Sequence, residues 1–127
     1  MKGLSIPPFL GGKFGSFTRD MTAASGNVSY TGLGFRPRGL IIQGGVDQST
    51  LVLFMGMTDF AGKSSIQCQS GALATLRILN SYIVYLGDAA GSQYVDTPTA
   101  DADGFTFNWM KSGTPGANTA TFTYRAF

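Results

Sequence analysis

The sequence predicts an all-β fold, an antiparallel β-sandwich or jelly roll of about eight strands. Short strand-like runs alternate with turns rich in glycine, of which the chain has 18, and turns every 8–12 residues are typical of such folds. The chain also lacks glutamate, a strong helix former and the usual partner in capping boxes and i,i+4 ion pairs. The only segment with helical character, Asp59–Lys63, is too short for more than one turn.

The 127 residues predict one domain, residues 13–127, preceded by an extended arm, residues 1–12. The arm is apolar, is interrupted by adjacent prolines and ends in Gly11-Gly12, so it can form neither a helix nor a central strand. We expect it to dock either on the rest of the domain or on a neighbouring subunit. Its interface residues are Leu4, Ile6, Pro7, Pro8, Phe9 and Leu10.

The first half of the domain predicts four strands. Lys13–Asp20 alternates but shifts phase at Gly15-Ser16-Phe17, which predicts a bulge. Asn27–Thr31 is strongly β-prone. Gly39–Gln43 and Leu51–Met57 are continuous apolar runs, the pattern of strands that are buried on both faces.

The next strands are expected to include a hairpin. Ser64–Ser70 alternates weakly, and Thr75–Leu79 and Tyr82–Leu86 then flank Asn80-Ser81, a plausible two-residue turn. A glycine at the second turn position would strengthen this prediction.

The last third predicts a second hairpin, with one apolar and one polar face. Residues 105–110 alternate through Phe105, Phe107 and Trp109, which places Trp109 in the core. Turn residues fill 112–117, and residues 120–126 alternate again to the C-terminus.

Charge is scarce, because only 13% of the residues are charged, about half the ordinary share. Either an assembly shields much of the surface, or serine, threonine and asparagine keep the chain soluble; we favour assembly. The net charge of +2 comes without a Lys/Arg run, so we expect no nucleic-acid partner. No apolar stretch is long enough for a membrane helix, and Pro7-Pro8 interrupts any signal-peptide pattern. Cys68 has no partner for an intrachain disulfide and is expected to be half-buried in a strand.

We expect no catalytic residue, no metal and no cofactor. Without histidine the chain has no Ser-His-Asp set. Asp101–Gly104 carries the closest carboxylate pair, but Asp-Gly is foremost a turn signal before a strand, and a calcium loop needs more oxygen ligands. Gly32-Leu33-Gly34 predicts a tight loop rather than a nucleotide site, because no helix can follow it. Arg36 and Arg38 form a candidate contact loop, either recognising an anion or, as we favour, pairing with an aspartate and facing water or an interface.

Aromatic residues on a sheet suggest an alternative, a sugar-binding platform. The candidates are Tyr82, Tyr85, Tyr94 and Trp109, although Trp109 fits the core better. Polar neighbours would be Asn80, Asp88 and Gln93. Under this alternative the glycan contacts are Asp88 and Tyr94.

Two segments resemble known proteins. Gly26–Ile42, GNVSYTGLGFRPRGLII, resembles a motif of small tailed-bacteriophage and prophage virion proteins, V-x-Y-T-G-x-G-F-x-P-K/R, that leads into an apolar strand. Asp103–Gly116, closing on Tyr124–Phe127, resembles the C-terminal hairpin of the same group. No such resemblance covers residues 43–102.

The resemblance implies a β-rich structural component of a phage particle, with no catalytic residues to transfer. Our leading hypothesis is a capsid decoration (cement) protein on the virion surface, made in the host cytoplasm. Its partners would be the major capsid protein and copies of itself, with trimers suited to local three-fold positions. The arm would anchor it to a neighbour by burying apolar area. The alternative is a tail-tip or fibre-associated lectin-like module that binds host carbohydrate.

Overall fold

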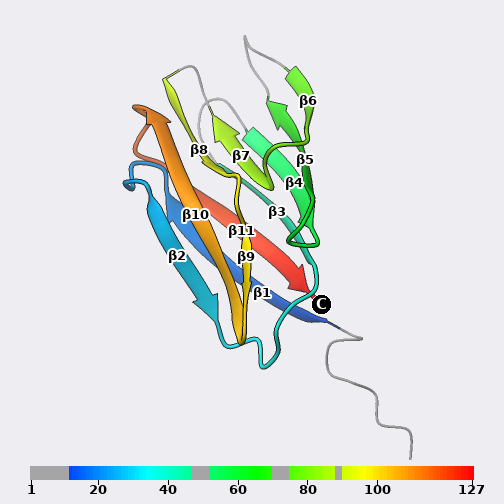
Figure 1. The fold of residues 1–127 in the computed structure, drawn as a ribbon. Helices are drawn as coiled ribbons and strands as arrows, with labels where there is room; N and C mark the ends of the chain where they lie inside the picture. The colour runs from blue at the N-terminus through cyan, green and yellow to red at the C-terminus, as the bar shows by residue number, and fades with distance from the viewer. Residues whose placement is uncertain (1–11, 47–51, 70–74, 88–89) are drawn as a thin grey trace, which may run out of the picture.

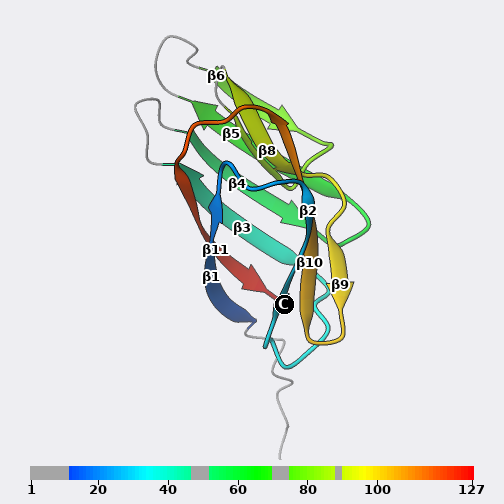
Figure 2. The same cartoon turned by 90° about the vertical axis from the view of Figure 1, so that its left-hand side faces the viewer.

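The computed structural model describes residues 12–46, 52–69, 75–87 and 90–127. These residues form eleven strands and no helix, arranged as two antiparallel sheets that face each other (Figures 1 and 2). Sheet A has the order β1-β11-β3-β4-β5-β6, and sheet B the order β2-β10-β8-β7, with β9 added to β10. The all-β, sandwich-like architecture expected from the sequence is therefore confirmed. A jelly-roll order is not, because β3 to β6 are simply consecutive neighbours.

The strands and their bounds are β1 (Lys13–Asp20), β2 (Gly26–Thr31), β3 (Leu40–Val46), β4 (Val52–Thr58), β5 (Lys63–Gln69), β6 (Thr75–Leu79), β7 (Val84–Gly87), β8 (Gly91–Val95), β9 (Thr99–Asp101), β10 (Gly104–Gly113) and β11 (Thr119–Ala126).

The core lies between the two sheets and is largely aromatic. Trp109 of β10 and Phe122 of β11 are both fully buried, and their ring centroids are 5.7 Å apart across the gap. Phe17 of β1 stacks on Phe122 at 4.7 Å and lies 4.1 Å from Tyr30 of the opposite sheet. Such ring pairs contribute about 0.5–1.5 kcal/mol each beyond their buried area, so they hold the two layers together. The predicted core position of Trp109 is confirmed.

One buried polar side chain joins the two layers beside Trp109. Gln93 of β8 is fully buried, and its Nε2 donates to the carbonyl oxygens of Met21 (3.0 Å) and Ala23 (2.8 Å). Its Oε1 accepts from the Arg19 guanidinium at 3.3 Å. Arg19 itself lies 4.8 Å above the Trp109 ring, so donors and acceptors are matched where the chain leaves β1.

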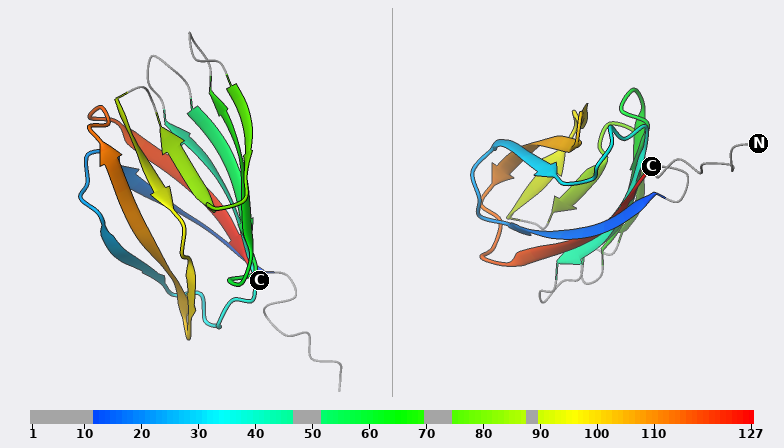
Figure 3. Two further views of the ribbon diagram at one scale, coloured as in Figure 1. Left: turned by 45° about the horizontal axis from the view of Figure 1, so that its top comes forward. Right: turned by 90° about the horizontal axis from the view of Figure 1, so that it is seen from below.

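Both predicted hairpins are wrong. β6 pairs with β5, whereas β7 pairs with β8 in the other sheet. β10 likewise belongs to sheet B and β11 to sheet A. In each case the turn segment carries the chain from one layer to the other (Figure 3), because alternation fixes which side of a strand is apolar but not which strand lies beside it.

Two further expectations fail. No bulge interrupts β1, since its register with β11 runs unbroken from Lys13↔Ala126 to Asp20↔Thr119; Phe14 points outward and Phe17 inward. The apolar runs of β3 and β4 are not buried on both faces. Sheet B covers only the inner side of sheet A, so alternate residues of both strands remain exposed.

The structure makes a prediction about Gly56 of β4. A Cβ at this buried position would collide with the backbone carbonyl of Ile83, at the point where the chain crosses between the sheets. We expect Gly56→Ala to lower the free energy of unfolding by about 2 kcal/mol or more, because backbone cannot yield as a flexible side chain does. Chemical denaturation of the purified domain measures this.

Gly26→Ala is the matched control, since no atom lies within 4 Å of the position that its added methyl group would take. If the two variants unfold at the same denaturant concentration, the close approach of Gly56 to the Ile83 carbonyl is contradicted.

Candidate functional site: the outer face of sheet A

The side of sheet A turned away from sheet B, called the outer face below, is its most unusual surface. Along β4 the burial alternates strictly, so every second side chain points away from the core. A similar alternation in β3 and β5, and the register of β6 with β5, bring ten outward side chains together. They are Ile41, Gln43, Leu53, Met55, Met57, Ser64, Ile66, Cys68, Leu76 and Ile78.

Strand register arranges these side chains in continuous rows across the sheet. Gln43 lies opposite Met55, Met55 opposite Ile66, and Ile66 opposite Ile78. A second row runs through Leu53, Cys68 and Leu76. Directly opposed side chains have Cβ atoms about 5 Å apart, so the apolar groups form one patch rather than scattered positions.

The patch is both exposed and uncharged. Leu76 and Ile78 are 74% and 71% exposed, and the other large apolar members are between 40% and 55% exposed. None of the ten residues carries a charge. Large contiguous apolar patches are rare on monomeric proteins and mark interaction surfaces. Two of the members are methionines, whose flexible side chains adapt to a partner's shape.

The inner side of β5 supports this interpretation, because there the usual polarity of a sheet is reversed. Ser65, Gln67 and Gln69 point inward and are buried, while Ile66 between them points outward. Ser65 Oγ and Gln67 Oε1 find no hydrogen-bond partner in the described part of the chain, and each such orphan costs about 1–3 kcal/mol. On β5 the sequence thus favours apolar contacts on the outer side.

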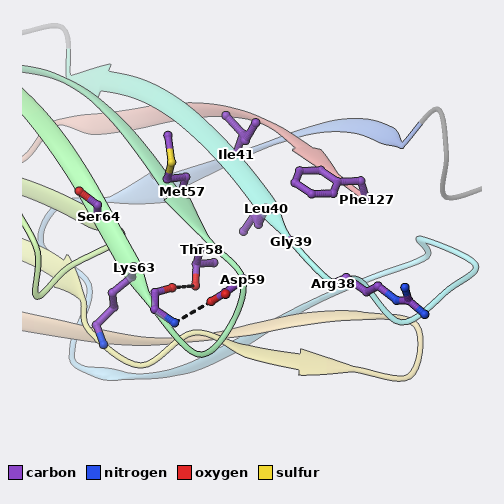
Figure 4. Close-up of a pocket in the computed structure, with 11 residues that line it drawn as sticks. Arg38, Gly39, Leu40, Ile41, Met57, Thr58, Asp59, Lys63, Ser64 and Phe127 are labelled. Atoms are coloured by element: carbon purple, nitrogen blue, oxygen red, sulfur yellow. Dashed lines mark hydrogen bonds between the residues drawn. The ribbon is translucent and has the colours of Figure 1, made fainter.

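A pocket of about 460 Å³ lies at one end of the outer face (Figure 4). Leu40, Ile41, Met57 and Phe127 supply its apolar lining, and Arg38, Asp59 and Lys63 lie around it. Phe127, the C-terminal residue, is held in place by backbone hydrogen bonds to Arg38 and Gly39. Its N–H donates to the Gly39 carbonyl (3.1 Å), and its carbonyl oxygen accepts from the N–H groups of Arg38 (2.7 Å) and Gly39 (2.9 Å).

The turn between β4 and β5 closes this pocket on one side. Thr58 Oγ1 donates to the Gly62 carbonyl at 2.6 Å, and Asp59 Oδ1 accepts from the N–H of Gly62 at 2.6 Å (Figure 4). The N–H groups of Gly62 and Ala61 hold the pKa of Asp59 below its usual value. The carboxylate is therefore committed to shaping the turn, not available for acid–base chemistry.

The structure describes only some of the contact residues predicted from the sequence. The arm residues Leu4, Ile6, Pro7, Pro8, Phe9 and Leu10 lie outside the described residues, as does Asp88. Arg36 and Arg38 are exposed on either side of a buried Pro37, and Arg38 lies at the pocket while Arg36 does not.

The loop before these arginines is built as the sequence predicts. Gly32 and Gly34 have φ values of +89° and +82°, which only glycine adopts freely. Asp103 fixes the loop, because its two carboxylate oxygens accept from the N–H groups of Gly34 (2.6 Å) and Gly32 (3.1 Å). This role of Asp103 is a contact that sequence reasoning did not find; its Asp-Gly turn is confirmed.

Three tyrosines meet on the outward side of sheet B. Tyr85 and Tyr94 are directly paired across β7 and β8, with ring centroids 6.0 Å apart and nearly parallel. Tyr82 packs against both, at 5.2 Å and 5.1 Å. Trp109, the fourth aromatic candidate, points into the core instead.

Few groups in the described part of the chain are arranged for catalysis. The described ranges contain no cluster of three potential metal ligands. Ser65 is buried on the inner side of β5, and Ser64 Oγ donates to Asn80 Oδ1 at 3.4 Å. Cys68 is exposed on the outer face rather than half-buried.

Comparison with protein-family models, with curated proteins and with solved structures finds no match to this chain. Within the described ranges, no helix has the length and apolar character needed to cross a membrane.

The outer face is a candidate functional surface that sequence reasoning missed. The sequence does carry a signal for it, the continuous apolar runs of β3 and β4. By itself, however, that pattern indicates strands buried on both faces within one domain. The low charge content points separately to assembly. Only the two observations in combination identify the patch.

The carboxylates predict how stability depends on pH. Hydrogen bonds from Thr22 to Asp20, from Gly62 and Ala61 to Asp59, and from Asn108 to Asp96 lower the pKa of each carboxyl group. A group whose pKa is lower when folded stabilises the fold above its unfolded pKa of about 4 and loses that effect as pH falls. With no histidine in the chain, we expect the urea midpoint to be constant from pH 5 to 7 and to fall below pH 4.

Asp96→Asn should reduce the size of that acid loss, because it removes one of the three carboxylates. A midpoint that changes between pH 6 and 7 in the purified chain would contradict this account.

Proposed function

We propose that the chain is a non-enzymatic structural subunit, built as a β-sandwich, that enters an assembly through the outer face of sheet A. The observation that carries the proposal is the exposed, uncharged patch of ten mostly apolar side chains. Burying apolar surface contributes about 25 cal/mol per Å², so covering even about 400 Å² of it supplies about 10 kcal/mol before the costs of association. Left in water, the same patch would favour uncontrolled aggregation.

The assembly we propose is a tailed-phage particle. Support comes from the resemblance of two segments to phage virion proteins, and these segments adjoin in the structure. β2, within the first segment, pairs with β10, within the second, from Gly104↔Thr31 to Trp109↔Gly26. The Asp103 contact to Gly32 and Gly34 joins them again at the loop. Within this chain the resembling residues thus form one structural unit.

Within the particle, we propose a capsid decoration protein on the virion surface, made in the host cytoplasm. The outer face would lie over contacts between major capsid subunits and stabilise them by burial. Copies of the chain would associate as well, with trimers suited to local three-fold positions. No cofactor or catalytic residue enters this mechanism.

A second candidate function is carbohydrate binding at the particle's tail tip or fibre. The observation that favours it is the cluster of Tyr82, Tyr85 and Tyr94, since aromatic rings on a sheet can stack against sugar rings. A carboxylate lies nearby, just after β8, where Asp96 accepts hydrogen bonds from Asn108 and Thr97. The outer face of sheet A has no part in this function.

Charge placed in the centre of the outer face tests the assembly proposal. We expect Ile66→Lys to reduce self-association or particle occupancy at least about tenfold, because an unpaired ammonium in an apolar interface is costly to desolvate. Light scattering of the purified chain measures self-association, and the copy number of the chain on particles measures occupancy.

Thr18→Lys is the matched control, because Thr18 is an exposed residue of β1 that faces the same side of sheet A outside the patch. Unchanged association and occupancy in Ile66→Lys would contradict the proposal.

A glycan array tests the second function. If the tyrosine cluster binds carbohydrate, the wild-type chain gives a hit that Tyr94→Ala abolishes, because the stacking surface is lost. Phe14→Ala, which removes an aromatic ring 76% exposed on the other sheet, should leave the hit intact. A hit that survives Tyr94→Ala would rule out this cluster, and the same test applies to Asp88→Ala.

A further inference from the structure

The pocket at the end of the outer face lies close to where the N-terminal segment joins the domain. β1 begins at Lys13, opposite Ala126 of β11, and the pocket includes the next residue, Phe127. Figure 1 shows the C-terminus beside the start of β1. Residues 1–11 are therefore attached to sheet A at the same end as the pocket.

The strand order sets how far the segment must travel to reach this pocket. β1 and β3 are separated by two strand spacings, and β1 and β4 by three. At about 4.8 Å per spacing these distances are about 10 Å and 14 Å. An extended chain covers about 3.3 Å per residue, so about four residues before Lys13 are enough to reach Ile41 of β3 and Met57 of β4.

The residue at the required distance is apolar. Leu10 and Phe9 lie three and four positions before Lys13, and Leu40, Ile41, Met57 and Phe127 give the pocket an apolar lining. Gly12 has a φ of +69°, a left-handed conformation that turns the chain just before β1 and suits glycine. A Cβ there would also lie 2.8 Å from the Ala126 carbonyl oxygen.

The rest of the segment matches the outer face in chemistry. Pro7 and Pro8 have no N–H to donate, so they cannot pair as a sheet strand but can lie across one. Leu4 and Ile6 continue the apolar character, and Lys2 is the only charged side chain in residues 1–11. The ten residues of the patch over β3 to β6 carry no charge that would have to be matched. Arg125 of β11 is exposed on the same side, opposite Ile41, so the segment passes one cation on its way to the pocket.

We propose that residues 4–10 fold back onto the outer face of their own domain and seat Phe9 and Leu10 in the pocket between Ile41, Met57 and Phe127. The short tether favours this docking over docking on a second copy, because it gives the segment a high effective concentration at its own pocket. The far side of the outer face, with Leu53, Leu76 and Ile78, stays open for the assembly partner. This docking replaces the expectation that the arm anchors the protein to a neighbour. It goes beyond the proposed function and would hold whatever the assembly partner is.

Disulfide trapping tests the docking in the full chain. Phe9→Cys is combined with Met57→Cys in a Cys68→Ser background, and the dilute protein is oxidised gently. We expect an intrachain disulfide, seen by mass spectrometry and non-reducing electrophoresis, that forms at least about tenfold faster than in the control. The control pairs Phe9→Cys with Leu76→Cys, a more exposed position on the same face about five strand spacings from β1.

Two results would overturn the proposal. One is an intrachain disulfide that forms no faster than in the control. The other is a disulfide that forms only between chains when separate Phe9→Cys and Met57→Cys proteins are mixed, which would place the segment on a second copy. Ile41→Cys replaces Met57→Cys if that variant fails to fold. Because the trapping uses dilute single chains, it can fail or succeed independently of assembly.

Discussion

Among the described residues, sheet A is covered on one side only, by sheet B, and most of the structure's properties depend on that constraint. The aromatic contacts of Phe17, Trp109 and Phe122 hold sheet B to its inner side. Sheet A is apolar on its outer side as well, over β3 to β6, and nothing in the described ranges covers that side. Two sheets that bury a shared core normally leave polar outer faces, so the outer face indicates a third layer supplied by something other than sheet B.

The two exposed faces of the molecule differ in chemistry, so the subunit would bind its partners in one orientation. The outward side of sheet B carries Tyr85 and Tyr94, with a hydrogen-bonded Asp96 nearby, groups that remain compatible with water. The ten-residue patch that sheet A carries over β3 to β6 has no charge, and the charged residues described on that side, Asp20 and Arg125, lie on β1 and β11. Under the proposed function, sheet A faces the partner subunits and sheet B faces solvent, so a structural role and a carbohydrate contact do not compete for the same surface.

Strand positions are predictable from the sequence far better than strand partners. Lys13–Asp20 is found as predicted, and Trp109 lies in the core because its alternation with Phe105 and Phe107 fixes one side of a strand. The same alternation cannot say that β10 and β11 belong to different sheets. β8 and β9 escape sequence reasoning because residues 91–101 mix polar and small side chains without a clear period. The sequence around Asp103 predicts only a turn residue. Its contact with Gly32 and Gly34 spans about seventy positions, so local sequence cannot reveal it.

Methionine oxidation tests most directly whether the outer face is buried in the assembly. Met55 lies at the centre of the outer face and is 46% exposed in the single chain, while Met110, on sheet B, is 38% exposed and serves as an internal reference. Peroxide oxidises accessible methionines to sulfoxides, and mass spectrometry gives the rate at each position. The account predicts that Met55 is protected in assembled particles while Met110 still reacts. Equal rates at the two positions in the assembled state would contradict it.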